Sequence, residues 1–236
     1  MKLQSIINNL VKEALEEASR ASLNEIWLDE AEYPESFSFE ELKGYRGMAG
    51  KTRYLQRHFG KKLGKGSARI VFPVDGDTVL KVALNEKGVA QNDVEIDAGK
   101  IGYEHIAKVY DFDDDSTWLE MERAERLKKT SLWPKLTGIQ ISFFDWYDVL
   151  TFQIRKRLRG GRTHPSIEPN VSKEILEQVY ESEMFNDIMG MIANHDMSAG
   201  DMGRPSSWGV VSRGGKQIPV LIDYGITPDV LRKHYS

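Results

Sequence analysis

Cysteine is absent from the 236 residues of this chain. That absence excludes disulfides, thiolate zinc sites, iron–sulfur clusters and a cysteine nucleophile, and a reducing compartment fits it. Long apolar runs are also missing: no stretch approaches the roughly 20 apolar residues of a membrane span, and the first 21 residues lack the apolar core of a signal peptide. The composition therefore predicts a soluble protein without a membrane partner.

Positive charge is not in excess either. The formal net charge is −4 and the isoelectric point is about 5.8, which argues against a protein that coats nucleic acid through its overall charge. We expect no sequence-specific nucleic-acid partner. Hydrophobic residues make up 40% and charged residues 29%, as in ordinary globular proteins, so a buried core is expected.

The pattern along the chain predicts an α+β protein with two lobes. A helical extension is expected first, with an amphipathic helix over residues 1–21. A first lobe then contains one helix and short strands, which are expected over 69–74, 78–83, 106–112 and 117–121. The second lobe is mainly helical and ends in a β-hairpin of strands 208–211 and 218–223, turned by Gly214-Gly215. The predicted boundaries of the three parts are 1–60, 61–122 and 123–236.

The residue pattern changes from helical to strand-like at Leu63, where a glycine-containing loop precedes a predicted strand. Gly64 and Gly66, one residue apart and followed by Ser67, allow a backbone to approach phosphate groups closely and to point N–H groups at them. Such a pair alone is more often a simple turn. The next residues strengthen the functional interpretation, because Asp75-Gly76-Asp77 predicts a hairpin between strands 69–74 and 78–83.

The returning strand contains Lys81 among apolar residues, where a lysine is costly to bury without a partner. Strand alternation puts Val79 and Lys81 on one face. Together with Val71 of the preceding strand, Val79 is predicted to cover a flat aromatic ring while Lys81 reaches phosphate. The helix expected over 86–98 supplies the carboxylate partner, for which Glu95 is the preferred candidate.

These residues carry a resemblance. Their order and spacing resemble the small lobe of protein kinases: Gly64-x-Gly66-x-x-Arg69-x-Val71, then Val79-x-Lys81, then Glu95. The run from Leu119 to Ala124 is similar to the strand that enters the kinase hinge. The resemblance implies a bilobal kinase-like fold that binds ATP. Met121 would line the back of the adenine pocket, and Glu122 and Ala124 would offer backbone contacts to the base.

Near the C-terminus, Asp223-Tyr224-Gly225 resembles the Asp-Phe-Gly motif of the same family, which implies that Asp223 holds Mg²⁺ between the phosphates. Two candidates remain for the catalytic base. Asn194-His195-Asp196 resembles a degenerate His-Arg-Asp, in which case Asp201 would be a metal ligand. Gly200-Asp201 instead resembles the Gly-Asp of small-molecule kinases, with Ser206 at the metal-ligand position. We prefer Asp201 as the base, with Asp196 as the alternative.

The sequence departs from the kinase pattern in three places. The third loop glycine is Arg69, which would stiffen the loop or reach phosphate itself, and the metal-binding asparagine is replaced. Too few residues follow Asp223 for an activation segment or the usual peptide-docking helices, so the second lobe is expected to be truncated. The runs Lys87–Asn92 and Ile222–Thr227 also resemble uncharacterised kinase-like proteins of tailed bacteriophages, which implies a viral protein of the host cytoplasm or the virion.

Three functions are therefore expected. The first is a Mg²⁺- and ATP-dependent phosphotransferase whose acceptor is a protein hydroxyl rather than a small molecule. The second is a pseudokinase that serves as an interaction or virion protein, supported by the altered metal-ligand position. The third is transfer of AMP instead of phosphate on the same fold.

Overall fold

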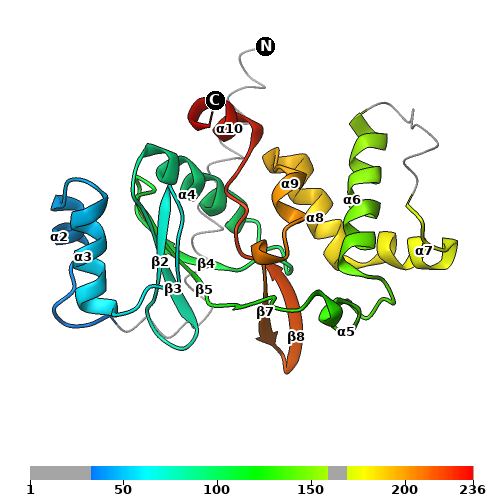
Figure 1. Cartoon of the computed structure of the whole chain (residues 1–236), viewed down its shortest axis with the longest axis horizontal. Coiled ribbons are helices and arrows are strands. Elements are labelled where there is room, and N and C mark those ends of the chain that lie inside the picture. Colours follow the sequence, from blue (N-terminus) through cyan, green and yellow to red (C-terminus); the bar gives the residue numbers. More distant parts are fainter. Residues whose placement is uncertain (1–32, 159–168, 236) are drawn as a thin grey trace, which may run out of the picture. The chain divides into compact units, whose positions relative to one another are not determined.

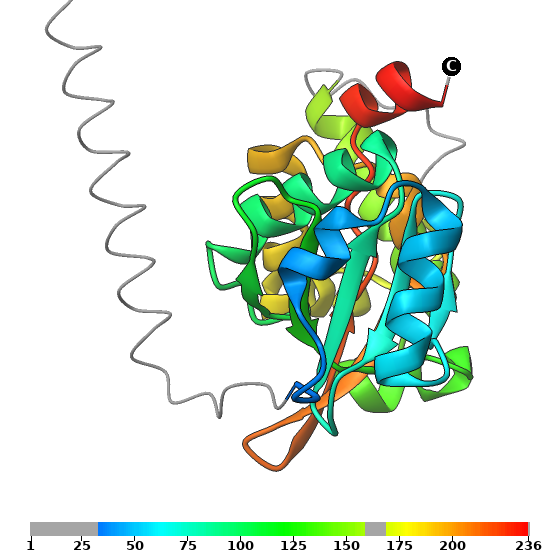
Figure 2. The same ribbon diagram turned by 90° about the vertical axis from the view of Figure 1, so that its left-hand side faces the viewer.

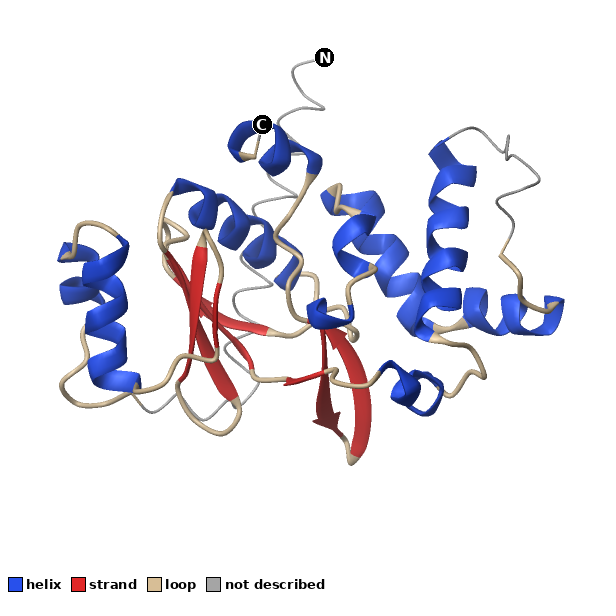
Figure 3. Ribbon diagram, viewed as in Figure 1, coloured by secondary structure: helices blue, strands red, loops and turns tan. Residues whose placement is uncertain are grey.

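The computed structural model describes residues 33–158 and 169–235 (Figure 1). Both helices and strands are present (Figure 3), and every ladder between named strands is antiparallel, which confirms the α+β class. The helix expected over 1–21 lies outside the described residues. The chain divides into two compact units. Unit 1 contains the described residues up to Val89 with Ile96–Gly102 and Lys108–Glu122, and unit 2 contains Ala90–Glu95, Tyr103–Ala107 and the described residues from Arg123 onward.

Unit 1 is built on a five-stranded sheet in the order β1-β2-β3-β5-β4. The strands are β1 (Gly64–Lys65), β2 (Arg69–Pro73), β3 (Thr78–Ala83), β4 (Val109–Phe112) and β5 (Trp118–Glu122). The predicted β2–β3 hairpin is confirmed. Its turn is held by the Asp75 carboxylate, which accepts hydrogen bonds from the backbone N–H groups of Asp77 (2.8 Å) and Thr78 (2.7 Å).

Two helices, α2 (Phe39–Gly44) and α3 (Met48–Phe59), cover one face of this sheet (Figures 1 and 2). Leu42 of α2 and Leu55 of α3 are buried, and the Phe39 ring stacks on Trp118 at 3.9 Å. Their core includes apolar residues from the sheet, which are Ile70, Phe72, Leu80, Val82 and Trp118. Residues 39–59 therefore complete the core of unit 1.

The β4–β5 turn is organised by one buried carboxylate. Asp113 accepts hydrogen bonds from the Thr117 hydroxyl at 2.6 Å and from the Trp118 N–H at 3.1 Å, and Lys43 of α2 pairs with it at 3.1 Å. Burial would raise the pKa of Asp113, but these partners outweigh burial and hold it below its usual value. The same carboxylate thus closes the turn and anchors α2.

Unit 2 combines helices with a three-stranded sheet in the order β6-β7-β8. Its helices are α5 (Trp133–Thr137), α6 (Phe143–Leu158), α7 (Lys173–Glu181), α8 (Glu183–His195), α9 (Ala199–Met202) and α10 (Pro228–His234), with 3₁₀ turns η1 (Thr130–Leu132) and η3 (Pro205–Ser207). The strands are β6 (Glu125–Arg126), β7 (Trp208–Arg213) and β8 (Lys216–Leu221). β6 interrupts a region that the sequence predicts to be mostly helical.

The terminal hairpin is confirmed, with a shifted end. Gly214 and Gly215 turn it with φ of 56° and 76°, values that glycine adopts without strain. β8 ends at Leu221 instead of Asp223, and the Ile222 N–H donates to the Ser207 carbonyl at 2.8 Å. The first part of the strand expected over 106–112 belongs to unit 2, because Ala107 donates to Leu221 and Leu221 donates to His105.

Helix α4 (Glu86–Gly99) matches the helix expected over 86–98. Asn85 caps its first turn by accepting from the Gly88 N–H at 3.1 Å, and its amide donates to the Ser67 carbonyl at 3.0 Å. The helix N-terminus is thereby tied to the glycine-containing loop of unit 1. In the part of the chain that the structure describes, no helix is both long and apolar enough to cross a membrane.

Candidate functional site

The glycine-containing loop of unit 1 is a tight turn that joins β1 to β2. The Gly66 N–H donates to the Arg69 carbonyl at 2.9 Å. A Cβ at Gly66 would have the Arg69 carbonyl oxygen, 3.9 Å away, as its nearest neighbour, and Gly66 does not adopt a positive φ. The packing and backbone conformation of this turn therefore do not require glycine at position 66. Arg69 itself is buried.

Lys81 lies at the centre of the sheet and is only 5% exposed. In the strand register Lys81 stands opposite Val71 on β2 and Leu119 on β5, while Val79 stands opposite Met121. Directly paired residues point to the same face, so Val71, Val79, Lys81 and Met121 share one face, as the sequence predicts. The helices α2 and α3 pack on the opposite face.

The residues expected at the hinge lie where unit 1 passes into unit 2. The Glu122 N–H donates to the Lys108 carbonyl at 2.8 Å, and the Glu122 carboxylate accepts from the Lys108 N–H at 3.2 Å. This backbone N–H is therefore not available to a base. Ala124 belongs to unit 2, where it lies against Gly209, at which an added Cβ would come within 2.5 Å of the Ala124 Cβ.

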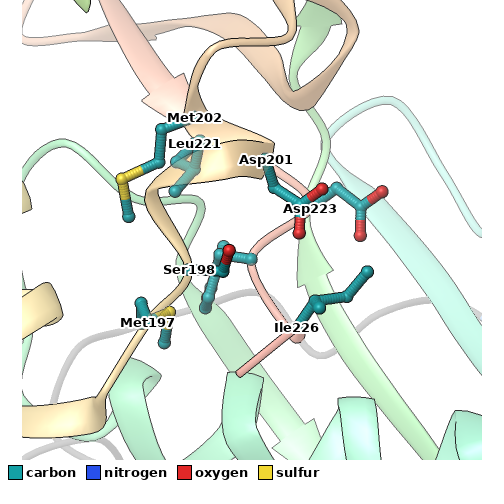
Figure 4. Close-up of a pocket in the computed structure, with 8 residues that line it drawn as sticks. Met197, Ser198, Asp201, Met202, Leu221, Asp223 and Ile226 are labelled. Atoms are coloured by element: carbon teal, nitrogen blue, oxygen red, sulfur yellow. The ribbon is translucent and has the colours of Figure 1, made fainter. Parts of the chain in front are cut away.

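Unit 2 contains a small pocket that brings together two of the predicted site residues, Asp201 and Asp223 (Figure 4). The empty space between these side chains is about 160 Å³ and includes open solvent, and it contains no enclosed cavity large enough for a water molecule. Asp201 comes from α9, and Asp223 follows the end of β8. The remaining lining residues are Met197, Ser198, Met202, Leu221, Tyr224 and Ile226.

Helix α9 is held in place at both ends. The Ser198 hydroxyl caps it by accepting from the Gly200 N–H at 3.3 Å, and the Trp208 indole donates to the Met202 carbonyl at 2.8 Å. Gly203 then allows close packing, since a Cβ there would lie 2.6 Å from the Tyr147 ring. Burial raises the pKa of Tyr147, so this ring stays neutral.

Trp208 is fixed in turn by an aromatic cluster. Its ring makes edge-to-face contacts with Trp133 at 5.0 Å and with Trp146 at 5.5 Å, and all three indoles are fully buried. This buried aromatic cluster therefore supports the short helix that carries Asp201.

The segment after Asp223 connects the pocket to α4. The Tyr224 N–H donates to the Glu95 carboxylate at 3.2 Å, and the Tyr224 hydroxyl donates to the Ala107 carbonyl at 3.2 Å. On the pocket side, the Ser198 N–H donates to the Ile226 carbonyl at 3.2 Å. Glu95 is fully buried and lies beside the residue that follows Asp223. The pairing of Glu95 with Lys81 stays a prediction.

Two acidic side chains, Asp201 and Asp223, line the pocket. The Asp201 carboxylate is 14% exposed and pairs with the largely exposed Arg204 at 3.3 Å. Among the described residues no group of three or more His, Cys, Asp and Glu is placed to hold a metal. Two carboxylates still suit Mg²⁺, which binds proteins through one or two carboxylates and takes its remaining ligands from water and phosphates.

Two other candidates do not join this pocket. Asp196 is exposed at the end of α8, in a left-handed conformation with φ 49° and ψ 40°. Ser206 is exposed in η3 and is not among the lining residues. Of the two aspartates considered for the base, the one that shares a pocket with Asp223 is Asp201.

Sequence reasoning missed Ser198 and Trp208. Ser198 stands three residues before Asp201, a spacing typical of a helix N-cap followed by an acidic residue, so this local signal was available. Trp208 gives no comparable signal, because its role depends on the Met202 carbonyl and on the aromatic rings around it.

No family model, no curated protein and no solved structure matches this chain. The case for a function therefore depends on the residues themselves.

Proposed function

We propose that this chain is a Mg²⁺- and ATP-dependent phosphotransferase with a minimal protein-kinase-like fold, and that its acceptor is a protein hydroxyl. The observation that carries the proposal is the presence of Asp201 and Asp223 in one pocket of unit 2. The buried Lys81, on the face of the unit 1 sheet opposite α2 and α3, supports it, as does a glycine at position 66 that the fold does not demand.

Each residue has a role in the proposed reaction. Lys81 binds the nucleotide phosphates, and Glu95 holds Lys81. Asp223 holds Mg²⁺, which neutralises the phosphate charge when bound. Asp201 orients the acceptor hydroxyl and takes its proton. The hydroxyl oxygen forms a bond to the γ-phosphorus, the bond from that phosphorus to the bridging oxygen breaks, and ADP leaves.

These few groups suffice because phosphoryl transfer depends mainly on positioning and electrostatics. The pocket that Asp201 and Asp223 share is also lined by the apolar side chains of Met197, Met202 and Ile226 (Figure 4). The Trp208 indole supports the helix that carries the proposed base through its hydrogen bond to the Met202 carbonyl.

The test uses ATP labelled separately at the α- and γ-phosphates, with Mg²⁺ or Mn²⁺. Transfer of the γ-label to the protein or to an added acceptor protein is the expected result. Asp223→Asn should abolish transfer, and Asp201→Asn should lower it by about 10²–10⁴-fold, the usual contribution of a general base. Asp196→Asn is the matched control, and its activity should equal that of the wild type.

Other outcomes decide between the alternatives. Transfer of the α-label would show AMP transfer. If neither label transfers and ATP does not raise the melting temperature, the phosphotransferase proposal fails. If Asp196→Asn is inactive while Asp201→Asn is active, the roles of the two aspartates are reversed.

A nucleotide-binding pseudokinase is the second candidate, and one contact favours it. Arg204 pairs with Asp201 at 3.3 Å and so competes with a proton or a metal ion for that carboxylate. A pseudokinase would show a melting temperature raised by ATP but no transfer of either label. Arg204→Ala would then leave transfer absent, whereas in an active enzyme it would change the rate.

A further inference from the structure

Helix α10 begins and ends with well-defined contacts. The Thr227 hydroxyl caps it by accepting from the Val230 N–H at 3.2 Å, and Pro228 occupies its first turn. Val230 is buried, which fixes the helix on unit 2. Asp229 pairs with Arg232 and Lys233 along the outer face. Tyr235 comes directly after the helix and is 43% exposed.

The end of α10 reaches a buried residue of α4 far away in sequence. The Gln91 side-chain amide donates to the Tyr235 hydroxyl at 2.6 Å. Gln91 is only 5% exposed, although amide side chains are seldom buried without hydrogen bonds. The contact therefore satisfies a polar group that would otherwise cost free energy.

A second contact on Gln91 is made by backbone. A Cβ at Gly225 would lie 2.4 Å from the Gln91 carbonyl oxygen and 2.9 Å from its Cβ. Gly225 is thus required by close approach of the two chain segments rather than by its φ, which is not positive. Gly225, which follows Asp223, and Tyr235, which follows α10, therefore both contact Gln91 of α4.

Gln91 and Glu95 are four residues apart on one helix, so they share a face. Glu95 accepts the hydrogen bond of the Tyr224 N–H at 3.2 Å. Residues 224–235 therefore contact both Gln91 and Glu95, and Asp223 of the pocket immediately precedes this segment. A displacement of this segment would move Glu95 and Asp223 together.

We propose that Tyr235 and Gln91 are positioning residues, and that α10 is a clamp that holds Glu95 in its working place on α4. The role of Glu95 rests on the proposed function, whereas the clamp itself is a property of unit 2. Tyr235 is partly exposed, and its hydroxyl contacts Gln91, which lies four residues before the buried Glu95 on the same helix.

The first measurement does not depend on catalysis. Tyr235→Phe removes one hydroxyl, and hydrogen exchange of the α4 amides at 91–95 should rise by roughly three- to ten-fold, which corresponds to one lost hydrogen bond. Tyr180→Phe is the matched control, because among the described residues its hydroxyl makes no hydrogen bond. It should leave exchange in α4 unchanged. Unchanged exchange in Tyr235→Phe would overturn the clamp.

The second measurement tests the link to Glu95. Tyr235→Phe should lower ATP affinity and γ-phosphate transfer by about the same three- to ten-fold factor, and Gln91→Ala should not add to it. In a Glu95→Gln background, Tyr235→Phe should have no further effect. Additive losses would overturn the positioning role and leave a merely structural one. If the wild type neither binds ATP nor transfers phosphate, the proposed function fails, and the exchange data still decide on the clamp.

Discussion

Glu120 is a carboxylate on the covered face of the unit 1 sheet. It is 7% exposed and accepts a hydrogen bond from the Tyr33 hydroxyl. Burial raises its pKa, and the neighbouring carboxylates Asp111 and Asp75 raise it further, while the Tyr33 hydrogen bond opposes the shift. Burial and the same acidic surroundings raise the pKa of Tyr33, so it remains the donor.

The sign of this shift predicts how stability changes with pH. A carboxyl whose pKa is higher in the folded state binds its proton more tightly there, so its favourable contribution is complete below the unfolded pKa of about 4.3. That contribution is lost as the pH rises through the raised folded pKa. Glu120→Gln keeps an acceptor for Tyr33 and has no proton to lose. The free energy of unfolding of Glu120→Gln should therefore increase relative to that of the wild type as the pH rises from about 4 towards 7.

Urea denaturation across this pH range measures the difference. Glu40→Gln, on the exposed side of α2, removes a charge of the same sign without contacting Tyr33. Its free energy of unfolding should change with pH in the same way as that of the wild type. A Glu120→Gln curve that also runs parallel would contradict the assignment.

At the scale of elements, α4 is fitted closely to the loop that precedes β2. A Cβ at Gly88 would lie 2.3 Å from the Ala68 carbonyl oxygen and 3.0 Å from the Ala83 Cα. Both neighbours are backbone atoms of residues that are themselves hydrogen-bonded, since Ala68 accepts from the Leu84 N–H and Ala83 donates to Thr117. The first turn of α4 therefore needs glycine for contact, not for helix formation.

Gly88→Ala should lower the free energy of unfolding by about 1–3 kcal/mol, the usual cost of overpacking. The gain in helix propensity, about 1 kcal/mol, opposes this loss. Gly44→Ala in α2 is the control, because nothing lies within 4 Å of its added Cβ. It should be neutral or slightly stabilising in the same chemical denaturation experiment. Equal stability of the two variants would show that α4 can move away from the loop.

At the scale of the molecule, α2 and α3 are part of the core of unit 1. The sequence predicts residues 1–60 as an extension, yet Tyr54 and Leu55 are almost completely buried with residues of β2, β3 and β5. Rings from Tyr33 to Phe59 add to the same layer, as in the stacking of Tyr33 on Phe37 at 5.2 Å. The sheet face would be exposed without them.

Leu55→Ala tests this packing. Removing a fully buried leucine should cost about 3 kcal/mol, and the loss should spread to the sheet. Hydrogen exchange of the β2, β3 and β5 amides should therefore increase along with that of α3. Gln56→Ala, exposed on the same helix, serves as the control. If only α3 exchanged faster, the helices would be an appendage after all.

Strong local signals made much of the fold predictable. The Asp-Gly turn and the Gly-Gly turn each act within a few residues, so both hairpins and α4 could be predicted from the sequence. Burial of the Leu80 and Val82 face of β3 against α2 and α3 was not predictable, because these helices lie well before the strand in the chain. The strand expected over 106–112 was split for a similar reason: its first residues pair with β8.

The candidate site shows the same division. The sequence alone determined which functional groups are present: a lysine in an apolar strand, a glycine-containing loop, and several aspartates near the C-terminus. The tertiary structure decided which aspartates meet, because Trp208 holds α9 and the end of β8 brings Asp223 to it. Residue type and spacing are local properties of the chain, whereas a shared pocket depends on packing between distant segments.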